Sequence, residues 1–106
     1  MARVKKFVLV HHGHLPPTPS VRAAWDEWVQ RRSANIADLG GSFGPGRLVT
    51  NDRTFELTLS TNPANGYTIV WAPHLDAAEQ LLEGCPIADS VSVYEAIDPL
   101  NQEIQP

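Results

Sequence analysis

The chain has 106 residues, enough for a single domain over 1–106, and its content of 42% apolar and 19% charged residues excludes a disordered or fibrous protein. Twelve acidic against eight basic side chains give a net charge of −4, which argues against nucleic-acid binding because that function needs a basic face. The longest apolar run, 7–10, is far too short to span a membrane. The single cysteine, Cys85, allows no disulfide within the chain, so we expect a cytoplasmic protein.

The first part of the chain predicts a strand followed by a long helix. Residues 3–12 hold a β-branched and aromatic run that ends at Gly13 and a proline-rich loop, which is typical of a strand covered on both faces. Thr18 or Ser20 can then cap a helix whose apolar stripe continues to Leu39. We expect Gly40–Gly41 to end this helix, because glycine accepts the left-handed conformation after the last turn.

The rest of the chain predicts strands around a second helix. Two short strand-like runs, 48–50 and 54–59, flank Asn51–Asp52, which favours a hairpin turn there. A loop by composition covers 60–66. The remaining expected elements are a strand at 67–72, a helix at 75–83 that stops at Gly84, a strand at 90–97 and a frayed polar tail after 98.

This order of elements predicts an α+β fold of the ferredoxin-like βαββαβ type, with two helices on one face of an antiparallel sheet. The strands are apolar toward both faces, as Val8 and Ile69 illustrate beside Phe7 and Val70. Monomers rarely expose an apolar sheet face of several hundred Å². We therefore expect a homodimer in which a second copy packs sheet to sheet on the uncovered face.

Several blocks of the sequence occur together in a known family. They are Trp25-Asp26-Glu27-Trp28, 38–45 (DLGGSFGP), 66–70 (GYTIV), 75–78 (LDAA), 83–86 (EGCP) and 90–95 (SVSVYE). In their order and spacing, over about residues 4–98, they resemble the YCII-related family. The resemblance implies a dimeric α+β barrel, in agreement with the homodimer inferred from the strands.

The resemblance also carries an expectation about chemistry. Some members resemble enzymes of chlorinated-aromatic breakdown, and a His–Asp pair in the cleft is proposed as catalytic in the broader family. The position that matches this histidine is Asn35, near the end of the first helix as expected from the sequence. Asparagine has no proton to exchange near neutral pH, so this chain does not inherit that acid–base role.

Three histidines at the end of the first strand are the main candidates for proton transfer. His11, His12 and His14 follow the strand into its loop, and an imidazole titrates close to neutral pH. His11 and His12 point to opposite faces of a strand and have no cysteine or HExxH partner nearby, so we predict no metal site. We expect His12, and after it His11, to act as general base, with Asp38 orienting the ring; a solvated aspartate is the alternative for Asp38.

Other residues are candidate ligand contacts, each with a structural alternative. Trp25 and Trp28 lie on the inner stripe of the helix, where core packing competes with an aromatic wall for a flat ligand. Arg47 could pair with a carboxylate or lie free on the surface. The full set of expected ligand contacts is His14, Trp28, Asn35, Phe43, Arg47 and Tyr94. Cys85 is expected to be a buried structural thiol.

Two functions from different classes remain open at this point. The first is a small-molecule enzyme of the proton-transfer or elimination type, a lyase or isomerase, acting on an organic substrate, for which an aromatic compound is one option, in a cleft between helix and sheet. It needs no cofactor. The second is a non-catalytic dimeric module that binds a ligand or serves as an accessory to another protein. A histidine that faces the cleft within reach of Asp38 would favour the enzyme.

Overall fold

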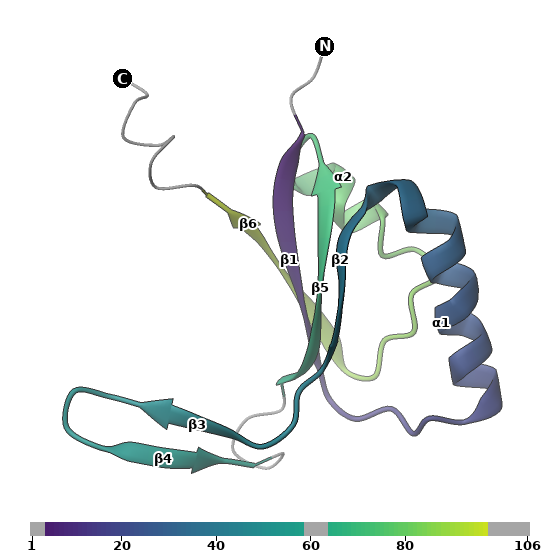
Figure 1. Cartoon of the computed structure of the whole chain (residues 1–106). Helices are drawn as coiled ribbons and strands as arrows, with labels where there is room; N and C mark the ends of the chain where they lie inside the picture. The colour runs from purple at the N-terminus through teal and green to yellow at the C-terminus, as the bar shows by residue number, and fades with distance from the viewer. Residues whose placement is uncertain (1–3, 59–63, 98–106) are drawn as a thin grey trace, which may run out of the picture.

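The computed structural model describes residues 4–58 and 64–97 of the chain. The elements in these segments alternate between strands and helices, with a hairpin inserted in the middle (Figure 1). In chain order they are β1 (Lys5–His12), α1 (Pro19–Arg32), the 3-10 turn η1 (Ser33–Asn35), β2 (Ile36–Ser42), β3 (Gly46–Val49), β4 (Thr54–Leu57), β5 (Ala64–Ala72), α2 (Leu75–Gln80) and β6 (Ser90–Ala96).

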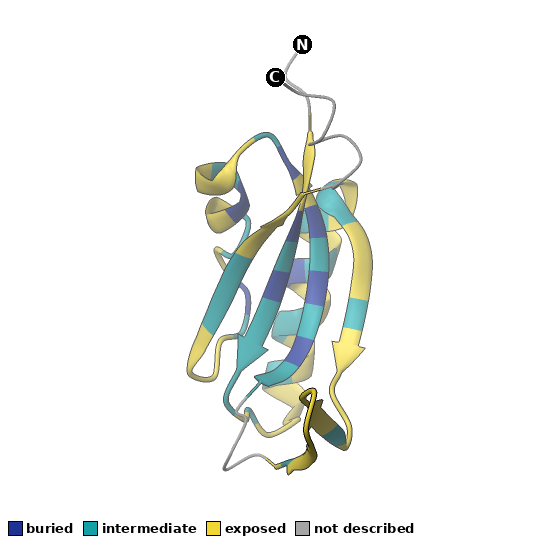
Figure 2. Cartoon of the chain, turned by 90° about the vertical axis from the view of Figure 1, so that its left-hand side faces the viewer, coloured by how far each residue is buried: buried dark blue, intermediate teal, exposed yellow. Residues whose placement is uncertain are grey.

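Four of the strands form one antiparallel sheet in the order β2-β5-β1-β6. Both helices lie on the same face of this sheet, as Figure 1 shows. The result is an α+β domain that is compatible with the expected ferredoxin-like fold. The opposite face, which is turned to the viewer in Figure 2, has no helix over it in the described residues, and we call it the open face.

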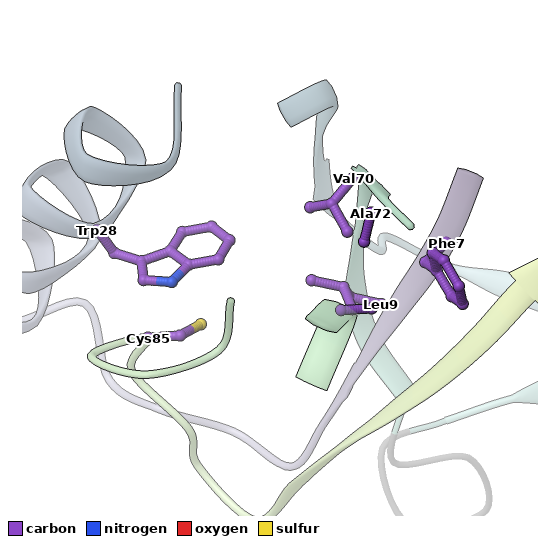
Figure 3. Packing of buried hydrophobic residues seen from close by; sticks show 7 residues of the cluster. Phe7, Leu9, Trp28, Val70, Ala72 and Cys85 are labelled. Carbon is purple, nitrogen blue, oxygen red and sulfur yellow. The ribbon is translucent and has the colours of Figure 1, made fainter. Parts of the chain in front are cut away.

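The core lies between the sheet and the helices, and strand alternation builds it. Odd-numbered residues of β1 and even-numbered residues of β5 point toward the helices, since successive side chains of a strand alternate between faces. Figure 3 shows Trp28 reaching from α1 toward Leu9 and Val70 of the sheet. The buried apolar side chains are Phe7, Leu9, Trp28, Val70, Ala72, Ala78 and Cys85.

Helix α1 begins where the sequence predicts. The Thr18 hydroxyl accepts a hydrogen bond from the backbone N–H of Val21 at 3.3 Å, and Pro19 takes the first turn, where its missing N–H costs nothing. At the other end Arg32 Nε donates to the carbonyl of Leu81 at 3.1 Å, which ties the helix to the segment after α2.

The expected continuation of the first helix to Leu39 is wrong. The helix ends at Arg32, and the chain from Ile36 onward is an edge strand paired with β5. Ile36 packs on the core as the helical stripe requires, but it does so from a position opposite Val70 in the sheet. Over so few positions, apolar residues spaced three or four apart fit a continued helix as well as a strand. The hydrogen-bonded pairing of this segment with β5 makes it a strand.

The double glycine therefore has a role other than ending a helix. Gly40 has a φ of 78° and lies within β2, inside the irregularity in the pairing with β5 between Asp38 and Gly41. A Cβ at Gly40 would lie 1.8 Å from the carbonyl oxygen of Tyr67, so only glycine fits at this close approach of two backbones.

The hairpin predicted around Asn51–Asp52 is confirmed, but it stands apart from the main sheet. Within the described residues, β3 and β4 pair only with each other, in register from Gly46↔Leu57 to Val49↔Thr54. The Thr50 N–H donates to the carbonyl of Arg53 at 2.8 Å and closes the turn. The hairpin projects from the open-face side of the sheet at the end near β2 (Figures 1 and 2).

The second half of the chain follows the prediction closely. The strand expected at 67–72 is part of β5, the last strand is β6, and the second helix is shorter than expected, ending at Gln80 before turns that lead to Gly84. His74 caps α2, its Nδ1 accepting from the N–H of Ala77 at 3.1 Å. Most of the expected loop 60–66 and the expected tail after 98 lie outside the described residues.

Candidate functional site

The two histidines at the end of β1 point to opposite faces of the sheet. His11 lies on the helix-covered face, where its Nε2 is 3.1 Å from the hydroxyl of Thr68. His12 lies on the open face, where its Nε2 is 2.7 Å from the hydroxyl of Ser92. Strand alternation therefore places only one of the two expected bases, the second choice, between helix and sheet.

His11 lines a cleft of about 360 Å³ between α1 and the sheet. The ring of Trp25 packs edge-on against the His11 imidazole, with the centroids 5.3 Å apart and the planes at 82°. The cleft is lined mainly by apolar, aromatic and backbone surface. Its residues are His11, Trp25, Asp26, Val29, Leu39, Gly40, Gly41, Ser42, Asn65, Gly66, Tyr67 and Thr68.

The surroundings of His11 favour its neutral form. Burial lowers the pKa of the His11 imidazole below its usual value of 6.5, and the neighbouring charge of His12 lowers that pKa further. At neutral pH the ring therefore has one N–H and one free lone pair. It can accept a proton or a hydrogen bond without first losing a proton.

One nitrogen of this ring has no partner. His11 Nδ1 is buried and is the only such side-chain atom in the described residues that lacks a hydrogen bond. A buried polar atom without a partner costs about 1–3 kcal/mol. If Nε2–H donates to the hydroxyl of Thr68, the unpartnered Nδ1 carries the lone pair that a ligand can use. The hydrogen bond to Thr68 then holds the ring in that tautomer.

Asp38 does not join either histidine. It lies opposite Ile69 of β5, whose side chain is on the open face, and its Oδ1 accepts a hydrogen bond from the N–H of Gly40 at 2.9 Å. In the described residues no hydrogen bond or ion pair links Asp38 to His11 or His12. The geometry thus does not supply the expected His–Asp38 pair, and Asp38 lies in strand β2 rather than at the end of a helix.

Three of the expected ligand contacts lie outside the cleft and away from one another. Asn35 donates from Nδ2 to the carbonyl of Trp71 at 3.2 Å, a bond that ties η1 to β5. Trp28 is fully buried, and its Nε1 donates to the carbonyl of Leu81 at 2.7 Å, so it is a core residue. Tyr94 is 58% exposed and lies opposite Val8 on the open face.

A second cavity brings together the three remaining expected ligand contacts, His14, Phe43 and Arg47. This cavity of about 650 Å³ lies where the β3–β4 hairpin joins the sheet. Arg47 is already paired there, with its Nε 2.9 Å from Glu56 Oε1. Phe43 stacks on Tyr67 at a centroid distance of 5.8 Å, and Asn65 lines both this cavity and the cleft.

Sequence reasoning missed two features of the cleft. Asp26 of α1 is an exposed acidic residue that lines the cleft, and Gly40 and Gly41 form part of the wall. The sequence feature that could have indicated Asp26 is its position directly after Trp25, which lies on the apolar stripe of the helix. No sequence signal marks the glycines as part of a cleft wall, because the spacing of Ile36 and Leu39 predicts a helix where the chain forms the strand β2.

Metal binding and membrane insertion find no support in the described residues. No three His, Cys, Asp or Glu side chains within 4–58 and 64–97 gather closely enough to hold a metal ion. Over the same residues, no helix combines the length and the apolar character that crossing a membrane requires.

Comparisons of this chain with models of protein families, with curated proteins and with solved structures found no match. The resemblance to the YCII-related family therefore stays a prediction from the sequence blocks.

Proposed function

We propose that this protein is a small-molecule enzyme of the proton-transfer or elimination type, with its site in the cleft between α1 and the sheet. His11 is the general base in this proposal. His12, the first choice from the sequence, lies on the other face and has no access to the cleft.

The observation that carries the proposal is the unpartnered Nδ1 of His11. Native structures pair nearly all buried polar atoms, so an exception calls for a reason. The ring has a lowered pKa, a hydroxyl that fixes one nitrogen and a free second nitrogen beside a cleft. In this arrangement a neutral imidazole can act as a general base toward a bound proton donor.

The lining of the cleft defines the class of ligand. Trp25 and Val29 offer aromatic and apolar surface, so the ligand is a small and largely apolar or aromatic molecule with one acidic proton or hydrogen-bond donor. Since Nδ1 itself is buried, the donor reaches it after a side-chain movement. Trp25, which packs against the imidazole, is the side chain placed to move.

Phenol and toluene test this proposal, because they share size and shape but only phenol has an O–H donor. Titration followed by the NMR signals of the Trp25 indole should show saturable binding of phenol and at least about tenfold weaker binding of toluene. The variant His11→Leu should bind both probes alike. His12→Leu, the same change at the next residue on the opposite face, should keep the preference for phenol. Equal binding of both probes by the unaltered chain would contradict the proposal.

The second candidate, a non-catalytic dimeric module, is favoured by the open face of the sheet. Val8, Val10 and Ile69 are only half-buried there, beside Trp71 at 37% exposed and Tyr94 at 58% exposed. A second copy packed sheet to sheet would remove this apolar surface from water and give the dimeric α+β barrel. We infer such a homodimer for both candidate functions, and a cytoplasmic location from the lone buried thiol of Cys85.

A further inference from the structure

The β3–β4 hairpin, residues 46–57, has one apolar side and one polar side, and we call it the arm. The cross-strand pairs Leu48↔Phe55 and Gly46↔Leu57 share one side. The other side holds the Arg47–Glu56 ion pair and the pair Val49↔Thr54. Leu48 is 51% and Phe55 is 41% exposed, with the Arg53 guanidinium over the Phe55 ring, so about half of this apolar surface meets water in a single copy.

An arm of this kind does not support itself. Two isolated strands are marginally stable in water and need a surface to pack on. The arm pairs with no other strand of 4–58 and 64–97, and it extends away from the domain rather than across it (Figures 1 and 2). The described part of the molecule is correspondingly wide and thin, 44 × 42 × 18 Å.

We propose that the arm packs across a second copy of this chain, with Leu48 and Phe55 as its main contacts. This inference rests on the homodimer proposed above and names the part of the chain that holds it together. It assigns the arm a role in assembly, separate from the cleft on the helix-covered face.

The position of the arm determines how two copies meet. It projects from the open-face side at the end of the sheet where β1 finishes and β5 begins. Two copies placed with their arms at the same end would collide. Two copies turned end for end avoid the collision, and each arm then meets the end of the partner sheet where β1 begins. Packed sheets lie about 10 Å apart, and a four-residue strand spans about 14 Å, so the arm is long enough to cross that gap.

The area of the open face also argues for the arm. Four strands about 4.8 Å apart and about seven residues long make a face of roughly 450 Å². A stable interface buries about 800 Å² on each partner. The arm adds roughly 130 Å² by the same strand spacing, more than a third of what the sheet face lacks.

Sedimentation equilibrium of the full chain and of three variants tests the proposal. Phe55→Asp places a charge on the apolar side of the arm, and Val49→Asp places the same charge on its polar side. Tyr94→Asp places it on the open face of the sheet. All three positions are exposed and lie outside the core, and circular dichroism confirms that each variant is folded.

The expected result is a dimer whose dissociation constant rises at least about tenfold in Phe55→Asp and in Tyr94→Asp, and stays within about threefold in Val49→Asp. A dimer that Tyr94→Asp weakens but Phe55→Asp does not would overturn the role of the arm and leave the sheet-face dimer standing. Equal weakening by Phe55→Asp and Val49→Asp would also overturn it, since the apolar side would then have no special part. An unaltered chain that stays monomeric would overturn the arm and the homodimer together.

Discussion

His11 and His12 are consecutive residues of β1 that serve opposite faces of one sheet. The ring of His11 bonds to Thr68 beneath α1, and the ring of His12 bonds to Ser92 on the open face. The cleft and the open face can therefore be altered independently, by substitutions one residue apart. This separation underlies the matched pair of variants in the binding test.

The lowered pKa of His11 makes the stability of the fold depend on pH. In the unfolded chain the ring binds a proton near pH 6.5, but in the folded protein it does so only at lower pH. As the pH falls through 6.5, the unfolded state therefore binds more protons, and the free energy of unfolding decreases. We expect urea unfolding to show this decrease between pH 7.5 and pH 5.5, and to show less of it in His11→Leu. An equal decrease in both proteins would mean that His11 is not the cause.

The two neighbouring glycines of β2 should respond very differently to alanine. Gly40→Ala forces a side chain into a left-handed residue and against the carbonyl of Tyr67, which we expect to cost about 3 kcal/mol or more of unfolding free energy. Gly41→Ala adds a methyl group with no atom within 4 Å and should change stability by about 0.5 kcal/mol or less. Chemical denaturation measures both. Similar losses at the two positions would contradict the close approach of β2 to β5.

Cys85 should be almost inert in the folded protein. Burial raises the pKa of its thiol to about 12, and the thiolate is the reactive form. At pH 8 we expect Ellman's reagent to react at least about a hundredfold more slowly with the folded chain than with the chain in urea. Fast labelling of the folded chain would show that Cys85 is accessible.

Trp28 should contribute more to stability than any other residue of α1. It is fully buried between helix and sheet, and its indole N–H donates to the carbonyl of Leu81. Trp28→Ala should lower the unfolding free energy by about 3–5 kcal/mol, a large share of what a domain of this size has. Trp28→Phe keeps most of the apolar volume and should cost clearly less. Thermal and urea unfolding measure the loss of unfolding free energy in each variant. Equal losses in Trp28→Ala and Trp28→Phe would mean that the apolar volume kept by phenylalanine contributes little.

Sequence patterns predicted the parts of the fold where local signals agree. The run 7–10 and the run 67–72 combine β-branched residues with clear punctuation, and both are strands. Thr18 and Pro19 marked the start of α1, and Asn51–Asp52 marked the hairpin. At each of these places propensity, capping and turn chemistry point the same way.

The same patterns failed at β2, where a long-range contact decides the structure. Ile36 and Leu39 continue the helical spacing of α1, but pairing of Ile36 with Val70 places this segment at the edge of the sheet. That error moved Asp38 from a helix end to a strand and removed it from the expected pair with histidine. Its replacement at the cleft, Asp26, depends on how α1 packs across the sheet, which no local pattern records.

The nitrogen NMR spectrum of the His11 ring, recorded at pH 7 with and without phenol, tests the central claim most directly. The account predicts a neutral ring in the free protein and a saturable change in the Nδ1 resonance when phenol binds, with the His12 ring unchanged. A charged ring at pH 7, or a neutral ring whose Nδ1 resonance ignores saturating phenol, would contradict the assignment of His11 as the base of a small-molecule site.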